Sequence, residues 1–319
     1  MTMSAQKGKR EVTSYSDWMS QLPPQLHNIP LFNLAIPGSH DSMSYDLDIN
    51  SSIIEPDQLK RLSWIYCARY IVRKWSITQE ETIAKQLDAG VRYFDLRIAR
   101  KANDTNPTRL YFYHGLYTRT DVETVFRVIN DWAGKHPKEI LILALSNFKG
   151  FDKKNEYQLH AHLISFIKTL FGGKLLPITS DPTLQSCWSK GKNVIVSYGK
   201  TNPHRELWSQ IPYYYGKSMD TTKVESEIRR VLETARPVKY FFVCGLNLTL
   251  PDNAGILLYI LRLCDNLTNV IQRSLPRLLR WLTQQAGKTP VNIVASDVVT
   301  RDDFVPTVVK FNTLKFGKA

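Results

Sequence analysis

Two histidines, three aspartates and one arginine stand at or just beyond the ends of predicted β-strands: His40, Asp41, Asp95, Arg97, His114 and Asp297. Two imidazoles, carboxylates that can orient them and a guanidinium form the set that cleavage of a phosphodiester by an internal hydroxyl requires. One imidazole removes the proton of the attacking hydroxyl, the other protonates the departing alkoxide, and the guanidinium holds the phosphate. Each proton transfer contributes roughly 10²–10⁴-fold in rate, and the reaction does not strictly need a metal ion.

Each of these residues also has an ordinary structural interpretation. A histidine after a strand can be a hydrogen-bonded loop residue, Asp41 can form a turn, Asp95 and Arg97 can form a structural ion pair, and Asp297 can cap the next segment. The catalytic hypothesis therefore depends on the fold bringing all six together. The other histidines have no such neighbours and are predicted to lie on the surface or in packing: His27, His136, His160, His162 and His204.

Short β-branched or aromatic runs alternate with longer stretches of helical periodicity, which favours βα units and a largely parallel sheet. Alternation along the second strand places Asp95 and Arg97 on one side, with Phe94 and Leu96 on the other. The predicted strands are residues 30–36, 91–97, 110–113, 139–145, 192–198, 240–248 and 291–296, with a less clear one at 211–215.

Helical periodicity fills the stretches between these strands. In the segment 78–90, Thr78 is predicted to cap the helix, Glu81 to complete a capping box and Gly90 to end it. Other helices are predicted over residues 121–135, 156–171, 221–235 and 255–285, the last divided by Pro276.

The alternation of strands and helices predicts an α/β fold, a closed (β/α) barrel of TIM type in which one helix can be missing. The barrel forms a single domain over residues 14–319, after a flexible basic leader over residues 1–13. The alternative is a doubly wound open sheet, but the glycine-rich phosphate turn of such sheets is absent after the first strand. In a barrel the carboxyl ends of the strands form the catalytic face, where the six ionisable residues would meet.

The composition restricts the partners of the protein. Among 319 residues, 42 lysines and arginines outnumber 29 aspartates and glutamates and give a formal net charge of +13, which favours nucleic acid, an anionic membrane surface or a phosphorylated substrate. The basic residues are scattered and form no recognisable nucleic-acid-binding module, so no nucleic-acid partner is expected.

No secretion signal is evident and the apolar stretch 254–261 is too short to span a bilayer, so we expect a cytoplasmic protein, peripheral at membranes. Oligomeric state is not predicted.

Five stretches resemble the X-domain of phosphatidylinositol-specific phospholipases C, and in particular the small stand-alone eukaryotic proteins that carry this domain. They are IPGSHDSMSY (36–45), KWSITQEETIAKQLDAGVRYFDLRIA (74–99), LYFYHGLY (110–117), HPKEILILALSNF (136–148) and NIVASDVV (292–299). The resemblance implies a distorted TIM-type barrel that cleaves the bond between phosphate and diacylglycerol in a phosphoinositide, giving diacylglycerol and an inositol (cyclic) phosphate.

The resemblance also implies a role for each matching residue. His40 is the general base on the inositol 2-hydroxyl, oriented by Asp297; His114 is the general acid, supported by Asp41; Arg97 meets the phosphate. Asp95, Tyr198 and Asn247 are further candidates for substrate binding. The large signalling enzymes of this family have acidic calcium ligands where Arg97 and Ser146 stand here, so we expect no metal and no calcium dependence.

We expect no separate lipid-recruiting domain, so recruitment to lipid is expected from the barrel surface or from a partner. Basic and aromatic residues alternate over residues 60–75, which suits a headgroup interface; a buried helix with a solvated basic face is the alternative. The arginines of the last helices are predicted to be solvated: Arg229, Arg230, Arg273, Arg277 and Arg280.

Two functions other than a phospholipase C remain compatible with this sequence. One is a phosphoinositide-binding adaptor that keeps the site but has little or no turnover. The other is a metal-dependent glycerophosphodiesterase on the same barrel, which would need a cluster of carboxylates where Arg97 stands.

Overall fold

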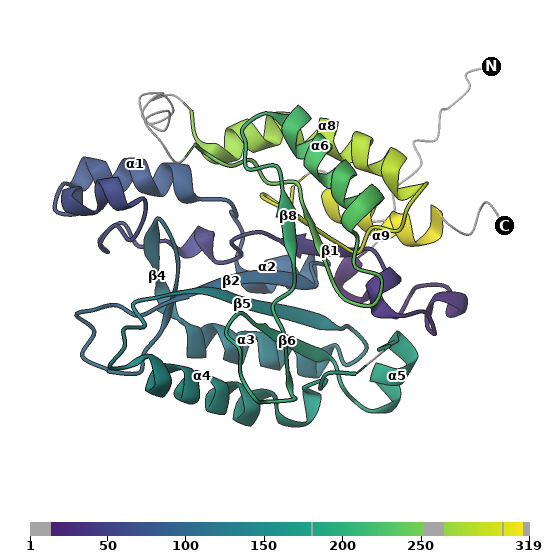
Figure 1. The fold of residues 1–319 in the computed structure, drawn as a ribbon. Helices are drawn as coiled ribbons and strands as arrows, with labels where there is room; N and C mark the ends of the chain where they lie inside the picture. The colour runs from purple at the N-terminus through teal and green to yellow at the C-terminus, as the bar shows by residue number, and fades with distance from the viewer. Residues whose placement is uncertain (1–13, 180, 252–264, 302, 315–319) are drawn as a thin grey trace, which may run out of the picture.

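Eight parallel strands curl into a distorted barrel in the computed structural model, which describes residues 14–179, 181–251, 265–301 and 303–314 (Figure 1). In spatial order they are β7 (Leu207–Trp208), β6 (Val194–Tyr198), β5 (Leu141–Lys149), β2 (Tyr93–Ala99), β1 (Ile36–Ser39), β10 (Ile293–Ser296), β9 (Val243–Gly245) and β8 (Tyr213–Tyr215). Within the described residues β7 and β8 do not pair with each other, so the hydrogen-bonded sheet is open between them. Two further strands, β3 (Tyr111–His114) and β4 (Leu116–Asp121), form an antiparallel hairpin on β2.

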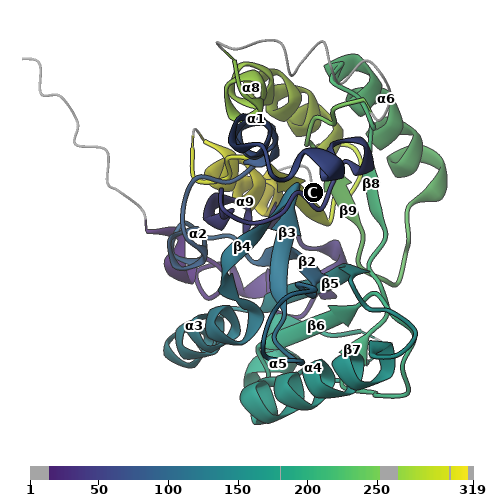
Figure 2. The same cartoon turned by 90° about the vertical axis from the view of Figure 1, so that its left-hand side faces the viewer.

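Helices α3 and α4 lie on one side of the barrel and α6 and α8 on the opposite side (Figures 1 and 2), all of them against its outer face. The helices are α1 (Tyr66–Ser76), α2 (Ile83–Asp88), α3 (Val122–Lys135), α4 (Glu156–Phe171), α5 (Leu184–Ser189), α6 (Thr221–Arg230) with its π-helical continuation η7 (Val231–Ala235), α8 (Leu267–Ala286) and α9 (Phe304–Leu314). Short 3-10 turns are η1 (Tyr15–Asp17), η2 (Pro24–Leu26), η3 (Leu31–Asn33), η4 (Ser44–Asp46), η5 (Asp57–Leu62) and η6 (Gly172–Lys174). Residues 199–206, all of them described, connect β6 to β7 without a helix. This agrees with the prediction that the barrel can lack one of its helices.

Alternation along the strands divides the core into two layers. Phe94, Leu96 and their counterparts on neighbouring strands pack outward against the helices, whereas Tyr93 packs inward, so the predicted division of β2 is confirmed. The inner layer also takes side chains from residues 18–34, which fill the amino-terminal end of the barrel. A Cβ at Gly38 would lie 2.9 Å from Tyr93 Cδ1, so this inward position of β1 has no room for a side chain.

The structure corrects three predicted elements. β1 begins at Ile36 rather than at residue 30, so Pro37 and Gly38 lie within the strand and not in a turn. Helix α2 begins at Ile83 with Thr82 as its cap, because Thr78 is buried and bonded elsewhere. Helix α8 continues through Pro276, whose exposed position lets water reach the carbonyl that proline leaves without a donor.

Some predictions fall outside the described residues. These are the leader over residues 1–13 and residues 255–264 of the predicted helix 255–285. The predicted solvated arginines of α6 and α8 are exposed, and Arg230, Arg273 and Arg277 form surface ion pairs. No described helix has the length and apolar character that crossing a bilayer requires.

Candidate active site

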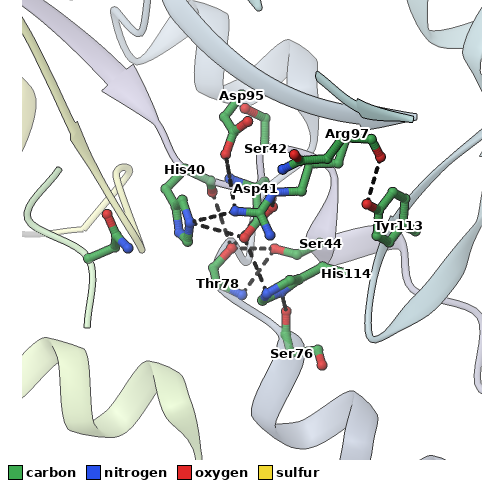
Figure 3. A network of polar contacts seen from close by, with 12 residues as sticks. His40, Asp41, Ser42, Ser44, Ser76, Thr78, Asp95, Arg97, Tyr113 and His114 are labelled. Atoms are coloured by element: carbon green, nitrogen blue, oxygen red, sulfur yellow. Dashed lines mark hydrogen bonds and ion pairs between the residues drawn. The ribbon is translucent and has the colours of Figure 1, made fainter. Parts of the chain in front are cut away.

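The six predicted residues meet at the carboxyl ends of β1, β2 and β10. Figure 3 shows five of them: His40, Asp41, Asp95, Arg97 and His114. Asp41 is the centre of the group: its Oδ2 lies 3.1 Å from His40 Nε2 and 3.2 Å from His114 Nε2, and its Oδ1 lies 2.7 Å from Arg97 Nε. Asp41 has φ of +42°, a left-handed conformation that aspartate adopts more readily than most residues. The two imidazoles, with ring centroids 6.2 Å apart, therefore share one carboxylate and face the same space.

His114 reaches this group by a route that the sequence did not predict. Its strand β3 is antiparallel to β2 and belongs to the hairpin, so His114 does not stand at the end of a parallel barrel strand. The hairpin pairs with the carboxyl end of β2 (Figure 2), and His114 Nε2 lies 3.2 Å from Asp41 Oδ2. The expectation that four barrel strands deliver the site is wrong in this detail, because three barrel strands and one hairpin do so.

His40 is held in one orientation by Asp297, whose Oδ1 lies 2.7 Å from His40 Nδ1. The other ring nitrogen, Nε2, faces both Arg97 Nη2 and Asp41 Oδ2 at 3.1 Å. A neutral ring can accept a hydrogen bond from Arg97 and a protonated ring can donate one to Asp41, so the surroundings fit both states. Burial lowers the pKa of His40, but the charges of Asp41 and Asp297 outweigh burial and raise the pKa to about 9.

His114 is oriented by a backbone carbonyl. Its Nδ1 lies 2.6 Å from Ser76 O, so Nδ1 carries the proton and donates it, while Nε2 faces the Asp41 carboxylate. Both ring nitrogens therefore face acceptors, an arrangement that the doubly protonated ring satisfies. This is the form that a general acid needs before it donates its proton.

Arg97 occupies the position that a cation would take among the carboxylates. His40, Asp41 and Asp95 each place one possible ligand atom within 4.8 Å of the others, but Arg97 Nη2 already lies 3.6 Å from Asp95 Oδ2 and its Nε contacts Asp41. Calcium prefers six to eight oxygen ligands, and two carboxylates already paired with a guanidinium do not provide that set. The residues present do not fit a divalent cation.

The carboxylates differ in their titration because their surroundings differ. Burial raises the pKa of Asp41, but Arg97, His114 and His40 outweigh it and hold the pKa below its ordinary value. For Asp95 and Asp297, burial raises the pKa and the neighbouring cations do not fully compensate. Of these three carboxylates, Asp41 therefore remains ionised to the lowest pH, because it lies between two imidazoles and a guanidinium.

Thr78 and Gln79 join the two strand ends that carry His40 and Asp297. Gln79 Nε2 donates to His40 O and to Ser296 O at 2.9 Å each, and Thr78 Oγ1 donates to His40 O at 3.2 Å. Both side chains are buried. These bonds explain why residues 78–79 are not helical, although a helix was predicted to begin at Thr78. They also fix the spacing between His40 and Asp297.

A cavity of about 470 Å³ opens beside this group. His40, Arg97 and His114 line it, and so does Asn247, which accepts a hydrogen bond from Tyr213 of 2.9 Å. Asp95 lines a smaller adjoining cavity beneath. Asn247 and Asp95 therefore line these cavities, and their contact with substrate stays a prediction.

Tyr198 lies elsewhere, which corrects the prediction that it touches the substrate. It shares its face of β6 with Val194 and Val196, and its ring packs in the outer layer. Its hydroxyl bonds His160 Nδ1 at 2.6 Å, so His160 serves in packing as predicted. The neighbouring residue Ser197 is the one that faces the smaller cavity, as strand alternation requires.

Several residues lining the cavities were not predicted, among them Glu55, Lys149, Tyr213 and Tyr215. The two tyrosines belong to the strand predicted weakly at 211–215, where alternation turns both toward the interior. Lys149 was missed because β5 extends four residues beyond the predicted end at 145. Glu55 lies in a loop that has no periodicity, so no sequence signal pointed to it.

The comparisons with known proteins agree with this geometry. The family model for the phosphatidylinositol-specific phospholipase C X domain matches residues 67–197. PI-PLC X domain-containing protein 1 of Homo sapiens is 38% identical over 93% of this chain and 92% of its own length. This chain belongs to the PI-PLC X domain-containing protein family. PI-PLC X domain-containing protein 2 of Mus musculus is 37% identical over 95% of this chain and 89% of its own length.

Solved structures resemble this PI-PLC X domain protein in fold. The phosphatidylinositol-specific phospholipase C of Staphylococcus aureus has a TM-score of 0.66 at 16% identity, covering 94% of this chain and 98% of that one. The enzyme from Listeria monocytogenes has a TM-score of 0.64 at 20% identity, with 94% and 99% covered. The single-domain, distorted (β/α) barrel predicted from the sequence is thus confirmed, but its predicted closure is not, because β7 and β8 do not pair within the described residues.

Proposed function

We propose that this protein is a phospholipase C that cleaves phosphatidylinositol-like lipids without calcium. The observation that carries the proposal is the placement of two imidazoles on one buried carboxylate, with Arg97 bonded to the same carboxylate and a cavity beside them. An imidazole base, an imidazolium acid and a phosphate-binding guanidinium are all that the intramolecular displacement needs.

In the proposed reaction, the inositol 2-hydroxyl oxygen attacks phosphorus while His40 Nε2 takes its proton. Asp297 stabilises the imidazolium that forms, because its carboxylate lies on Nδ1. The bond from phosphorus to the glycerol oxygen breaks, and His114 Nε2 gives its proton to that oxygen. The products are diacylglycerol and an inositol 1,2-cyclic phosphate, and no water is consumed. Arg97 donates to the phosphate oxygens as charge develops on them.

Contact with an anionic membrane surface is part of the proposal. Exposed apolar side chains cluster on η5, α1 and the turn between them, where Trp64 is 79% and Tyr66 59% exposed, beside the exposed Lys60 and Arg61. Elements of the same segment line the cavity, including Trp75 of α1. Insertion of this surface would bring the cavity to the lipid headgroups. We infer a cytoplasmic protein that is peripheral at membranes.

Only Val72, Trp75 and Ser76 of α1 are buried, and this supports the headgroup-interface interpretation over a buried helix. Arg69 and Arg73 nevertheless have a structural part, since Arg69 Nε donates to Ile49 O and Arg73 Nε donates to Leu47 O. These two arginines hold the preceding loop against α1. The membrane charge is therefore assigned chiefly to Lys60 and Arg61.

The test is turnover of phosphatidylinositol by the purified protein in calcium and in excess chelator, with products identified by mass. We expect diacylglycerol and cyclic inositol phosphate in both conditions. Loss of activity on chelation would instead support the metal-dependent phosphodiesterase, with His40, Asp41 and Asp95 as its ligands. Binding to lipid with no product in either condition would support the adaptor.

A further inference from the structure

Glu55 places a carboxylate in the wall of the substrate cavity, and no step of the proposed reaction uses it. Its Oε2 lies 2.7 Å from Lys149 Nζ, and its Oε1 accepts a hydrogen bond of 3.3 Å from the backbone N–H of Gly115, the residue after His114. Both side chains of the ion pair are only partly exposed, 28% for Glu55 and 36% for Lys149. The pair therefore bridges the His114 hairpin and the end of β5 at the edge of the cavity.

Every lysine or arginine among the described residues lining this cavity has a carboxylate partner. Arg97 contacts Asp41 and Asp95, and Lys149 contacts Glu55. A second carboxylate on the same wall, Asp57, is paired with Lys60 at 2.7 Å. Burial raises the pKa of Glu55, but His114, Lys149 and Arg97 outweigh it and lower the pKa, so the carboxylate is charged at neutral pH.

The pairing of these charges limits how many phosphates on the headgroup the cavity can accept. A phosphodiester carries one negative charge, which Arg97 can meet. Each further phosphomonoester on the inositol ring adds about 1.5 to 2 negative charges near pH 7, and the remaining cation of the cavity is already matched by Glu55. A ring phosphate near Lys149 would also approach the Glu55 carboxylate, and like charges placed together reject a ligand effectively.

We propose that Glu55 is a specificity-determining residue that makes the cavity select inositol lipids with a single phosphate and reject those with additional ring phosphates. This inference rests on the proposed function, because it assigns the substrate class of the same site. Glu55 acts as the repulsive element, and its removal would leave Lys149 as an unmatched cation in the cavity wall.

The decisive variant is Glu55→Gln, which removes the charge but keeps an oxygen that can accept from Gly115 N–H. Wild type and variant are given phosphatidylinositol, its monophosphate and its bisphosphate in neutral detergent micelles, and the ratio of turnover is measured. We expect the wild type to prefer phosphatidylinositol and the variant to shift the ratio toward the phosphorylated lipids by about tenfold or more. Glu55→Gln with Lys149→Met should not show this gain.

Glu81→Gln is the matched control, since Glu81 pairs with Lys85 at the same 2.7 Å distance but does not line the cavity. It changes the net charge equally and so measures general attraction to more anionic micelles. An unchanged ratio in Glu55→Gln, a shift equal to that of Glu81→Gln, or a wild type that already prefers phosphorylated lipids would overturn the inference.

Binding separates failure of this inference from failure of the proposed function. Glycerophosphoinositol and its ring-phosphorylated forms are titrated by calorimetry into wild type and Glu55→Gln, which requires no turnover. If no lipid is cleaved but Glu55→Gln gains affinity for the phosphorylated headgroups, the inference stands and the phospholipase activity fails. If cleavage occurs and no gain appears in binding or in turnover, the inference alone is wrong.

Discussion

Asp297 Oδ1 lies 2.7 Å from His40 Nδ1, although the two residues are 257 positions apart in the chain. They follow β10 and β1, which are parallel neighbours in the sheet, so their side chains meet beyond the same strand ends. Val298, directly after Asp297, has φ of +47°, which is strained for a β-branched residue. Its N–H donates to Thr78 O at 2.7 Å, so the strained turn that aims Asp297 is held in place.

The pH dependence of turnover should depend on Asp297. A general base works when it is deprotonated, and the pKa of His40 is raised to about 9, so kcat/KM should rise with pH from 6.5 toward 9. Asp297→Asn removes one of the two charges that raise this pKa, so the rise should move to lower pH while the limiting rate falls, by roughly 10²-fold or more. The measurement is kcat/KM from pH 5 to 10 in both proteins. An unmoved profile would contradict the assignment of His40 as the base.

The two histidines should differ in their response to the leaving group. His40→Ala and His114→Ala should each slow cleavage of phosphatidylinositol by roughly 10²–10⁴-fold. A nitrophenyl ester of inositol phosphate has a leaving group that needs no proton, so His114→Ala should recover most of its rate on this substrate and His40→Ala should not. His162→Ala, which removes an imidazole paired with Glu123 on the surface, is the control and should stay at the wild-type rate. If His114→Ala is slowed as much on the nitrophenyl ester as on phosphatidylinositol, His114 is not the acid that protonates the leaving group.

Binding to membranes should depend on Trp64. Trp64→Ser should weaken sedimentation with anionic vesicles by about tenfold or more, since burial of an indole in the interface is lost. Turnover of a soluble short-chain substrate should remain unchanged. Tyr157→Ser is a matched control, because Tyr157 is 85% exposed but lies on α4, far from α1 (Figure 1). The membrane assignment is wrong if both variants bind as the wild type does.

Stability should depend on the buried pair of Arg92 and Glu139. Arg92 Nη2 lies 2.8 Å from Glu139 Oε2, and neither side chain is exposed. Arg92 also donates to Ser16 O and Glu139 accepts from Met19 N–H, so the pair anchors the segment that fills the end of the barrel. Arg92→Met leaves a buried carboxylate without its partner and should cost about 3–5 kcal/mol in urea unfolding.

A surface pair supplies the control for this measurement. Glu227 and Arg230 are 2.7 Å apart at an exposed position of α6, so Glu227→Gln should change stability by less than about 1 kcal/mol. If the two variants unfold at the same urea concentration, the buried pair does not hold the amino-terminal segment.

The sequence by itself determined the local features of this protein. Period-two runs located most of the barrel strands, although β1 was placed too early and β7 was not predicted, and the same alternation put Asp95 and Arg97 on one face of β2. Periods near 3.6 located α4 with the bounds that the structure has and α3 to within one residue, because each is capped or flanked by turn residues and presents one apolar stripe. Histidines and aspartates after strands predicted a site, since parallel strand ends meet at one rim.

Only the tertiary structure decided how the site is assembled. The antiparallel pairing of β3 with β2 depends on contacts between distant residues, so nothing local in the sequence showed that His114 arrives on a hairpin. Ser76 orients His114 through its carbonyl, and any residue type has a carbonyl, so no residue type pointed to it. Thr78 looked like a helix cap, yet burial against His40 outweighed that local preference, because long-range hydrogen bonds among buried groups are stronger determinants than capping in an exposed turn.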